Sequence, residues 1–164
     1  MVQKDKQERG PVNLSDVVDD VLRLVHSDAL EHHCVLATEP DPELPLVEAN
    51  RVQIQQVLLN LVVNALDAMR ETPVAARRVI IRSEGESDDR VRVSVRDFGT
   101  GLPAEAPERI FERFFSTKRE GMGMGLAIAR SIIASHGGEL AAKNVEGGGA
   151  CVHFSLPVIG KGQR

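Results

Sequence analysis

The stretch that decides the fold is VRVSVRDFGTG, residues 91–101. Its first six residues alternate between apolar and charged or polar side chains, which predicts a half-buried β-strand. Asp97 stands where this alternation ends, and Gly99 and Gly101 follow it. Glycine lets the backbone turn sharply and lets a ligand come close, because it has no Cβ. An ionised carboxylate there can accept a hydrogen bond from a flat, amine-bearing ligand, although Asp-x-Gly also occurs in ordinary turns.

Length and composition indicate one globular domain. The chain has 164 residues, of which 42% are hydrophobic and 27% are charged. Residues 1–10 are polar and predict a linker remnant, residues 11–158 predict the folded domain, and residues 159–164 predict a disordered tail. With a net charge of −4 and no Trp or Tyr, the sequence does not support binding to nucleic acid.

Two features favour a cytoplasmic location. No stretch has the roughly 18 uncharged apolar residues of a membrane span, and no signal peptide opens the chain. Cys34 and Cys151 each lie in an apolar, strand-like stretch, which favours reduced, buried thiols over a disulfide. We therefore expect a cytoplasmic domain that does not itself contact a membrane.

The first helix is predicted from apolar residues that recur at three- and four-residue spacings between Leu14 and Ala29, with Ser15 as the N-cap. The basic loop at 70–78 is expected to be a solvated edge rather than a docking surface, and 84–90 a polar loop. Besides the strand before Asp97, short strands are expected at residues 34–38, 46–47, 79–82, 139–145 and 150–156.

The second helix is expected to begin after Asn50, a good N-cap residue, and to run to about Arg70. It has no charged residue between positions 52 and 66. Its polar side chains form a stripe at helical spacing: Gln53, Gln56, Asn60, Asn64 and Asp67. Solvated helix faces usually carry Lys, Glu and Arg, and buried amides need partners, so we favour a ligand-facing stripe over a solvated one. Asn60 and Asn64 are one turn apart and can point at the same ion or phosphate.

Alternating glycines precede the third helix, which is expected from Leu126 to His136. Backbone N–H groups and the helix dipole at such an N-terminus favour a bound anion. The pattern at Gly121, Gly123 and Gly125 is neither a P-loop nor a dinucleotide fingerprint. His136 is expected to cap the helix C-terminus rather than to act in catalysis.

The segment from Leu102 to Met124 is rich in proline, glycine and charge, with one apolar insert at residues 110–115. Its phenylalanines fit two interpretations equally well. They can be anchors in the core, or docking points of a loop that closes over a ligand.

Together these motifs resemble the ATP-binding catalytic domain of bacterial sensor histidine kinases, which shares its fold with gyrase, Hsp90 and MutL. The matching motifs are the N box QVLLNLVVNA (56–65), the G1 box DFGTG (97–101), the F box FERFF (111–115) and the G2 box GMGMGL (121–126). Four motifs in the family's order, over about residues 10–158, make the resemblance specific. It implies an α/β two-layer sandwich, with a mixed sheet of about five strands against three main helices.

The resemblance also implies a role for each site residue. Asn64 would bind Mg²⁺ through its side-chain oxygen, and Asn60 would face the ATP phosphates. Asp97 would accept a hydrogen bond from the adenine amino group, and Gly99 and Gly101 would let the backbone pass close to the base. Lid residues and the third helix would hold the nucleotide through Phe111, Lys118, Gly121, Gly123, Gly125 and Leu126, with Lys118 near the γ-phosphate.

Two departures from the family pattern matter. Gly149-Ala150 stands where the family often has Gly-Thr, so a hydroxyl near the adenine end is missing. The family's phospho-accepting histidine belongs to a separate helical hairpin, and none of His26, His32, His33, His136 and His153 has its sequence context.

We therefore predict a monomeric catalytic fragment that binds MgATP. It would phosphorylate a histidine on a helical dimerisation domain, with a response regulator as the indirect partner. Three alternatives remain open: a nucleotide-binding regulatory module without phosphotransfer, an anti-sigma-factor-type serine kinase, and a DNA-linked ATPase. The short lid and the absence of a carboxylate at position 60 weigh against the last.

Overall fold

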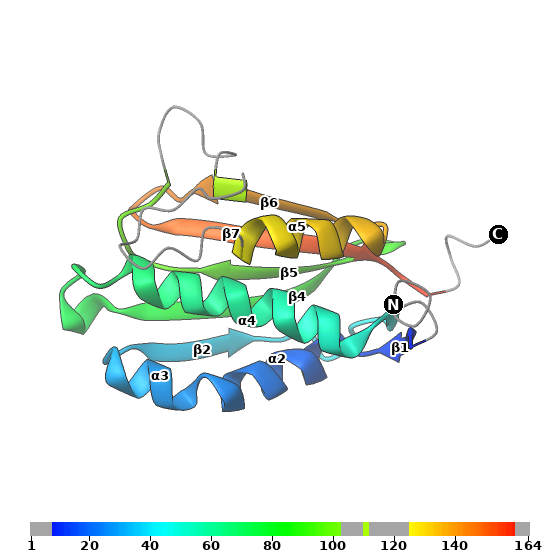
Figure 1. Cartoon of the computed structure of the whole chain (residues 1–164), viewed down its shortest axis with the longest axis horizontal. Coiled ribbons are helices and arrows are strands. Elements are labelled where there is room, and N and C mark those ends of the chain that lie inside the picture. The colour runs from blue at the N-terminus through cyan, green and yellow to red at the C-terminus, as the bar shows by residue number, and fades with distance from the viewer. Residues whose placement is uncertain (1–7, 103–109, 112–124, 160–164) are drawn as a thin grey trace.

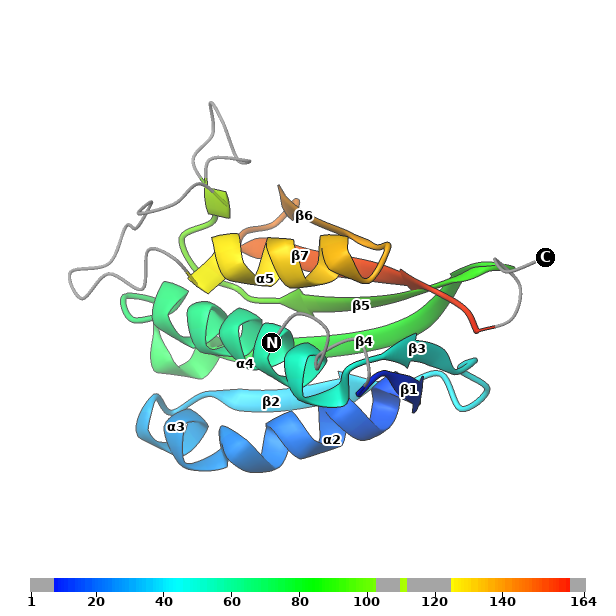
Figure 2. The ribbon, with the colours of Figure 1, turned by 45° about the vertical axis from the view of Figure 1, so that its right-hand side comes forward.

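The computed structural model describes residues 8–102, 110–111 and 125–159, which form a layer of helices over one face of a sheet (Figures 1 and 2). In chain order the elements are β1 (Gly10–Val12), α2 (Leu14–Leu24), α3 (His26–Glu31), β2 (Val35–Glu39), β3 (Val47–Ala49), α4 (Arg51–Ala68), a 3-10 turn (Val74–Ala76), β4 (Arg78–Ser87), β5 (Arg90–Arg96), α5 (Gly125–Ser135), β6 (Glu139–Asn144) and β7 (Ala150–Pro157).

The main sheet has five strands in the order β2-β4-β5-β7-β6. The β2–β4 pair is parallel and the other three pairs are antiparallel, so the sheet is mixed. Helices α2, α4 and α5 lie side by side on one of its faces (Figure 2). The predicted two-layer α/β fold is confirmed.

The core lies between α4 and the middle strands. Val91, Val93 and Val95 of β5 are buried, while the alternate side chains are only half-buried, as the period-two pattern predicts. They pack into one cluster with buried residues of α4 that include Ile54 and Leu58. Burying each such side chain contributes about 1.5–3 kcal/mol.

The single helix predicted between Leu14 and Ala29 is wrong, because the structure has two helices there. Val25 interrupts the helix with φ −98° and ψ 6°. Its side chain is fully buried, so the break keeps it in the core while α3 turns beside β2 (Figure 2). The N-cap is Asn13 rather than Ser15, since Asn13 Oδ1 accepts a hydrogen bond from Ser15 N at 2.8 Å.

Two strands differ from the sequence expectation. Strand β4 continues through Ser87, where the sequence predicts a polar loop, because its second half is paired with β5 and exposed to solvent. Strand β1 was not predicted, and it pairs antiparallel with β3, Gly10 opposite Ala49. Both strands depend on backbone pairing more than on burial, so hydrophobic alternation does not mark them.

Arg77 is not part of a solvated edge, as the basic loop had suggested. Its guanidinium donates hydrogen bonds to three backbone carbonyls, those of His32 at 2.7 Å, Arg70 at 2.9 Å and Thr72 at 2.9 Å. It thereby joins the end of α3, the loop after α4 and the start of β4. Within the part of the chain that the structure describes, no helix is both long and apolar enough to cross a bilayer.

Candidate nucleotide site

Asp97 lies directly after β5 and is 5% exposed. Its Oδ1 accepts hydrogen bonds from Gly99 N at 2.9 Å and from Ala150 N at 3.2 Å. Its own backbone N–H donates to Ala150 O at 2.9 Å. The first residue of β7 is therefore hydrogen-bonded to both the backbone and the side chain of Asp97. With Oδ1 occupied in this way, Oδ2 is the oxygen that can accept a hydrogen bond from a ligand.

Burial raises the pKa of the Asp97 carboxyl, and the N–H groups of Gly99 and Ala150 and the charge of Arg96 partly oppose that rise. The backbone donors therefore compensate part of the desolvation of an ionised carboxylate. An acceptor held in this way is oriented before a ligand arrives.

Two glycines are required by close packing around Asp97. A Cβ on Gly99 would lie 2.3 Å from the carbonyl oxygen of Ala68 at the end of α4. A Cβ on Gly149 would lie 2.1 Å from the carbonyl oxygen of Asp97, and the φ of Gly149 is +84°. The loop after β5 is thus pressed between α4 and the turn before β7. The predicted role of Gly99 beside a base is not tested by this packing.

Asn144, which the sequence analysis did not select, holds the far side of the same loop. Its Oδ1 accepts from Leu102 N at 2.7 Å and its Nδ2 donates to Leu102 O at 3.4 Å. Gly101, with φ +83°, lies directly against Asn144 Oδ1. The only signal in the sequence was an asparagine at the end of a strand, which is also common in turns.

Helix α4 joins this loop to the start of α5. Asn60 Nδ2 donates to Gly125 O at 3.3 Å, so the predicted phosphate-facing asparagine does meet the predicted glycine-rich helix start. Asn64 is half-buried one turn further along α4, and Ala68 at the helix end contacts Gly99. Asn60, Asn64 and Ala68 thus lie along α4 between the start of α5 and the loop after β5.

Phe111 is 5% exposed and belongs to the core cluster. The Arg130 guanidinium of α5 lies 5.0 Å from the centre of its ring, in a cation–π contact. Of the two interpretations, core anchoring therefore describes Phe111. Leu126 is half-buried against the core. Lys118, Gly121 and Gly123 lie outside the described residues, as do the other F-box phenylalanines.

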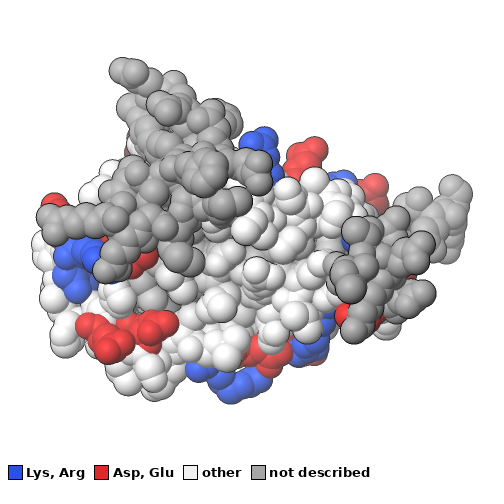
Figure 3. Space-filling view, in the orientation of Figure 1, with Lys and Arg blue, Asp and Glu red and all other residues white. Residues whose placement is uncertain are grey.

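The helix layer presents an almost uncharged surface over α4 and α5, with Lys, Arg, Asp and Glu gathered at its margin (Figure 3). Val52 of α4 is 70% exposed and Ile128 of α5 is 41% exposed. This surface therefore carries much less charge than the margin around it (Figure 3).

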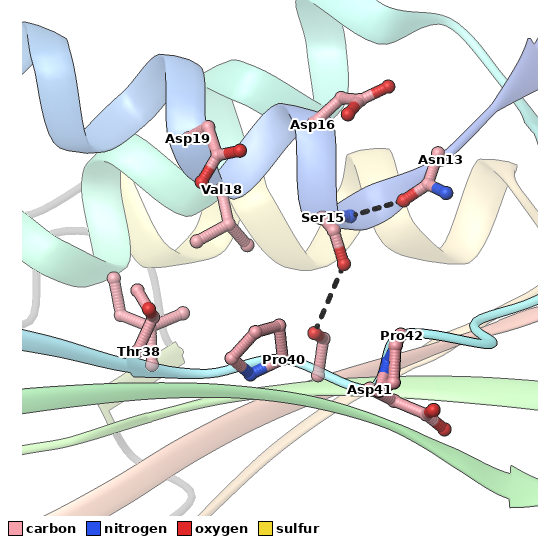
Figure 4. A pocket seen from close by; sticks show the side chains of 11 residues that line it. Asn13, Ser15, Asp16, Val18, Asp19, Thr38, Pro40, Asp41 and Pro42 are labelled. Atoms are coloured by element: carbon pink, nitrogen blue, oxygen red, sulfur yellow. Dashed lines mark hydrogen bonds between the residues drawn. The ribbon is translucent and has the colours of Figure 1, made fainter.

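A separate cavity of about 260 Å³ lies between α2, β4 and the loop after β2 (Figure 4). Asp16, Asp19 and Asp41 line it, and Ser15 Oγ lies 3.5 Å from Ser83 Oγ within it. None of the predicted nucleotide residues that the structure describes lines this cavity. Its three carboxylates would repel a phosphate, so this cavity does not suit a nucleotide.

Comparison with known families places the chain among ATPases. The family model described as histidine kinase-, DNA gyrase B-, and HSP90-like ATPase matches residues 49–159. The sensor protein TdiS of Thauera aromatica is 39% identical over 96% of this chain, and the chain spans 29% of the length of TdiS.

Solved structures of histidine kinases have the same fold. The catalytic domain of histidine kinase ThkA is 38% identical, with a TM-score of 0.81 over 92% of this chain and 96% of that one. ThkA has also been solved in complex with response regulator protein TrrA. Full-length ShkA in complex with AMPPNP is 31% identical, with a TM-score of 0.80 over 92% of this chain and 31% of that one.

Proposed function

Since this chain belongs to the family of histidine kinase-, DNA gyrase B- and HSP90-like ATPases, we propose that it binds MgATP for phosphoryl transfer to a histidine. The observation that carries the proposal is Asp97, whose Oδ1 is held by two backbone donors while Oδ2 is left for a ligand. In this proposal Oδ2 accepts a hydrogen bond from the adenine amino group. A buried acceptor of this kind selects adenine over guanine, which presents a carbonyl oxygen at the same position.

The phosphates would lie near the middle of α4, where Asn60 contacts the start of α5. The N-terminus of α5 at Gly125 and Leu126 supplies backbone N–H groups and a partial positive charge for an anion. The side-chain oxygen of Asn64 suits Mg²⁺, a hard cation that prefers oxygen ligands and keeps several waters. In the same proposal Gly121 and Gly123 continue the anion site and Lys118 neutralises charge on the γ-phosphate.

The reaction is a displacement at the γ-phosphorus. A neutral nitrogen of the acceptor histidine forms the new bond to phosphorus, the bond to the β–γ bridging oxygen breaks, and ADP leaves. Mg²⁺ would supply neutralisation of the developing charge. The residues of this chain would orient the nucleotide, and Asn60 would keep the start of α5 beside it.

The acceptor histidine would belong to a helical dimerisation domain, as the resemblance to sensor histidine kinases implies. The chain spans about a third or less of the length of the sensor kinases it matches. The uncharged surface over α4 and α5 supports docking of such a domain, because little charge must be desolvated there (Figure 3). A response regulator would then receive the phosphoryl group, and the structure of ThkA in complex with response regulator protein TrrA supports a partner of that class. We further propose that the fragment itself is a cytoplasmic monomer that turns ATP over slowly at most.

Calorimetric titration with a non-hydrolysable ATP analogue, with and without Mg²⁺, tests the proposal. Asp97→Asn preserves the shape of the side chain but places an amide N–H opposite the adenine amine. We expect affinity to fall at least about tenfold, since a buried donor pair is left unsatisfied. Asp88→Asn, an exposed acid in the β4–β5 turn, is the matched control. Absence of binding by the wild-type chain at millimolar nucleotide would refute the proposal.

A further inference from the structure

His136 connects two helices that the proposed site depends on. It follows α5 and is 6% exposed. Its Nδ1 lies 2.8 Å from the carbonyl oxygen of Ile132, and its Nε2 lies 3.1 Å from the backbone nitrogen of Asn50. Because the N–H of Asn50 is a donor, Nε2 must be the unprotonated nitrogen and Nδ1 must carry the proton. The ring is therefore neutral and bonded on both sides.

Asn50 is the N-cap of α4 and is itself 3% exposed. The contact therefore ties the beginning of α4 to the end of α5. A second tie joins the same helices further along, where Asn60 Nδ2 donates to Gly125 O at the beginning of α5. Between these ties α5 packs through Ala129 and Ile133, both fully buried. Each helix is a stiff rod, so a shift at one tie changes the position of the other.

We propose that the hydrogen bond between Asn50 N–H and His136 Nε2 is a positioning contact for nucleotide binding. It keeps α5 in the orientation that brings Gly125 to Asn60 and thereby sets the place of the phosphates. The inference rests on the proposed function, because it assigns a role in that site to a residue which does not touch the nucleotide. It adds to the expected capping role of His136, which the contact of Nδ1 with the Ile132 carbonyl bears out.

A pair of substitutions separates the two hydrogen bonds of the ring. His136→Gln can place an amide oxygen where Nε2 accepts from Asn50 but loses the donor to Ile132. His136→Asn can keep an amide donor near the Ile132 carbonyl but is too short to reach Asn50. Protection of the Asn50 amide from hydrogen exchange reports directly whether the bond between the helices is present.

The measured quantity is the Kd of the ATP analogue, at a temperature where circular dichroism shows both variants folded. We expect His136→Gln to bind within about twofold of wild type and His136→Asn about tenfold more weakly, the effect of one buried hydrogen bond. We also expect the Gly125 amide resonance to shift only in His136→Asn before nucleotide is added. Equal affinities, or affinities that follow thermal stability instead of the Asn50 bond, would overturn the inference.

A second pair of substitutions tests the same hydrogen bond at its α4 partner, Asn50. Asn50→Ala and Asn50→Pro both remove the side-chain cap on Gln53 N, but only proline removes the backbone donor. The φ of Asn50 is −85°, close to the range of proline. Weaker nucleotide binding by Asn50→Pro than by Asn50→Ala is expected, and identical binding would contradict the inference. If wild type binds and neither pair differs, the proposed function stands and only the positioning role fails.

Discussion

Two buried polar side chains, Asp97 and His136, show how burial acts on acids and bases in opposite directions. Burial disfavours the charged form of each, so it raises the pKa of Asp97 and lowers the pKa of His136. In both residues specific hydrogen bonds from neighbouring backbone groups fix one side of the side chain. In both residues, backbone groups rather than clusters of charged side chains orient the buried polar side chain.

The stability of the domain should depend on the protonation of His136. Its pKa is lowered in the folded state, mainly by burial and further by the charge of Arg9, while the Ile132 carbonyl opposes the shift. The unfolded chain therefore binds more protons between the folded pKa and the ordinary value near 6.5. The stability that the neutral His136 ring contributes is fully present above about pH 6.5. It is lost as the pH falls through the pKa of His136 in the folded state.

Thermal denaturation between pH 7.5 and 5 measures this effect. We expect the Tm of wild type to decrease toward acid pH more steeply than that of His136→Gln, which cannot take up the proton. Parallel pH profiles for the two proteins would show that His136 does not contribute.

Among the elements, α4 connects the two ends of the proposed site. Its last turn contacts the loop after β5, where Thr100 N donates to Ala68 O at 3.3 Å and Gly99 packs against the same carbonyl. Its middle contacts the start of α5 through Asn60. Any displacement of α4 relative to β5 must therefore change the distance between the adenine and phosphate ends.

Gly99→Ala should disturb this element contact directly, because the new Cβ would lie 2.3 Å from Ala68 O. We expect unfolding free energy to fall by about 1–3 kcal/mol, typical of overpacking. Nucleotide affinity should fall as well, since the loop that holds Asp97 must move.

Gly85→Ala is the control, because nothing lies within 4 Å of a Cβ there. Urea denaturation and calorimetry measure both quantities. Unchanged binding by Gly99→Ala would mean that the loop after β5 does not form the site.

In the whole molecule the two layers differ in charge. The helix layer is almost uncharged over α4 and α5 (Figure 3). The strands β4 and β5, by contrast, carry ion pairs such as Arg82–Glu84 at 3.2 Å and Arg92–Glu86 at 3.2 Å. The layers are joined at one end by Arg77, which binds backbone carbonyls of the loop after α4, at Arg70 and Thr72, and of the distant His32 at the end of α3. The two faces therefore differ in the amount of charge that a partner would have to desolvate.

Arg77→Gln should loosen the junction of these segments. Hydrogen bonds from a charged donor to otherwise unpaired carbonyls contribute about 1.5–3 kcal/mol, so we expect a loss of about 2 kcal/mol in unfolding free energy. Arg78→Gln, on the exposed neighbouring residue, should change stability by less than about 0.5 kcal/mol. Urea denaturation compares the two variants, and equal stability would show that Arg77 is a solvated side chain after all.

Local patterns in the sequence were enough to predict much of this structure. The alternation in residues 91–96, the N-cap at Asn50 and the uncharged stretch of α4 involve only neighbours within one or two turns, and each predicted its element correctly. The motif order led to the family, which the comparison confirmed. The roles of Lys118, Gly121 and Gly123 stay predictions.

Other features depend on residues that are distant in the chain, and only the tertiary structure decided them. His136 meets Asn50 across 86 positions, and Asp97 meets Ala150 across 53. The break at Val25 divides one continuous apolar pattern into α2 and α3, and no local signal in the sequence marked it. Periodicity and capping report interactions within a few residues, whereas these contacts exist only after the sheet has brought remote segments together. For that reason the sequence alone predicted which residues would form a nucleotide site, and the fold decided which distant segments hold the described ones in place.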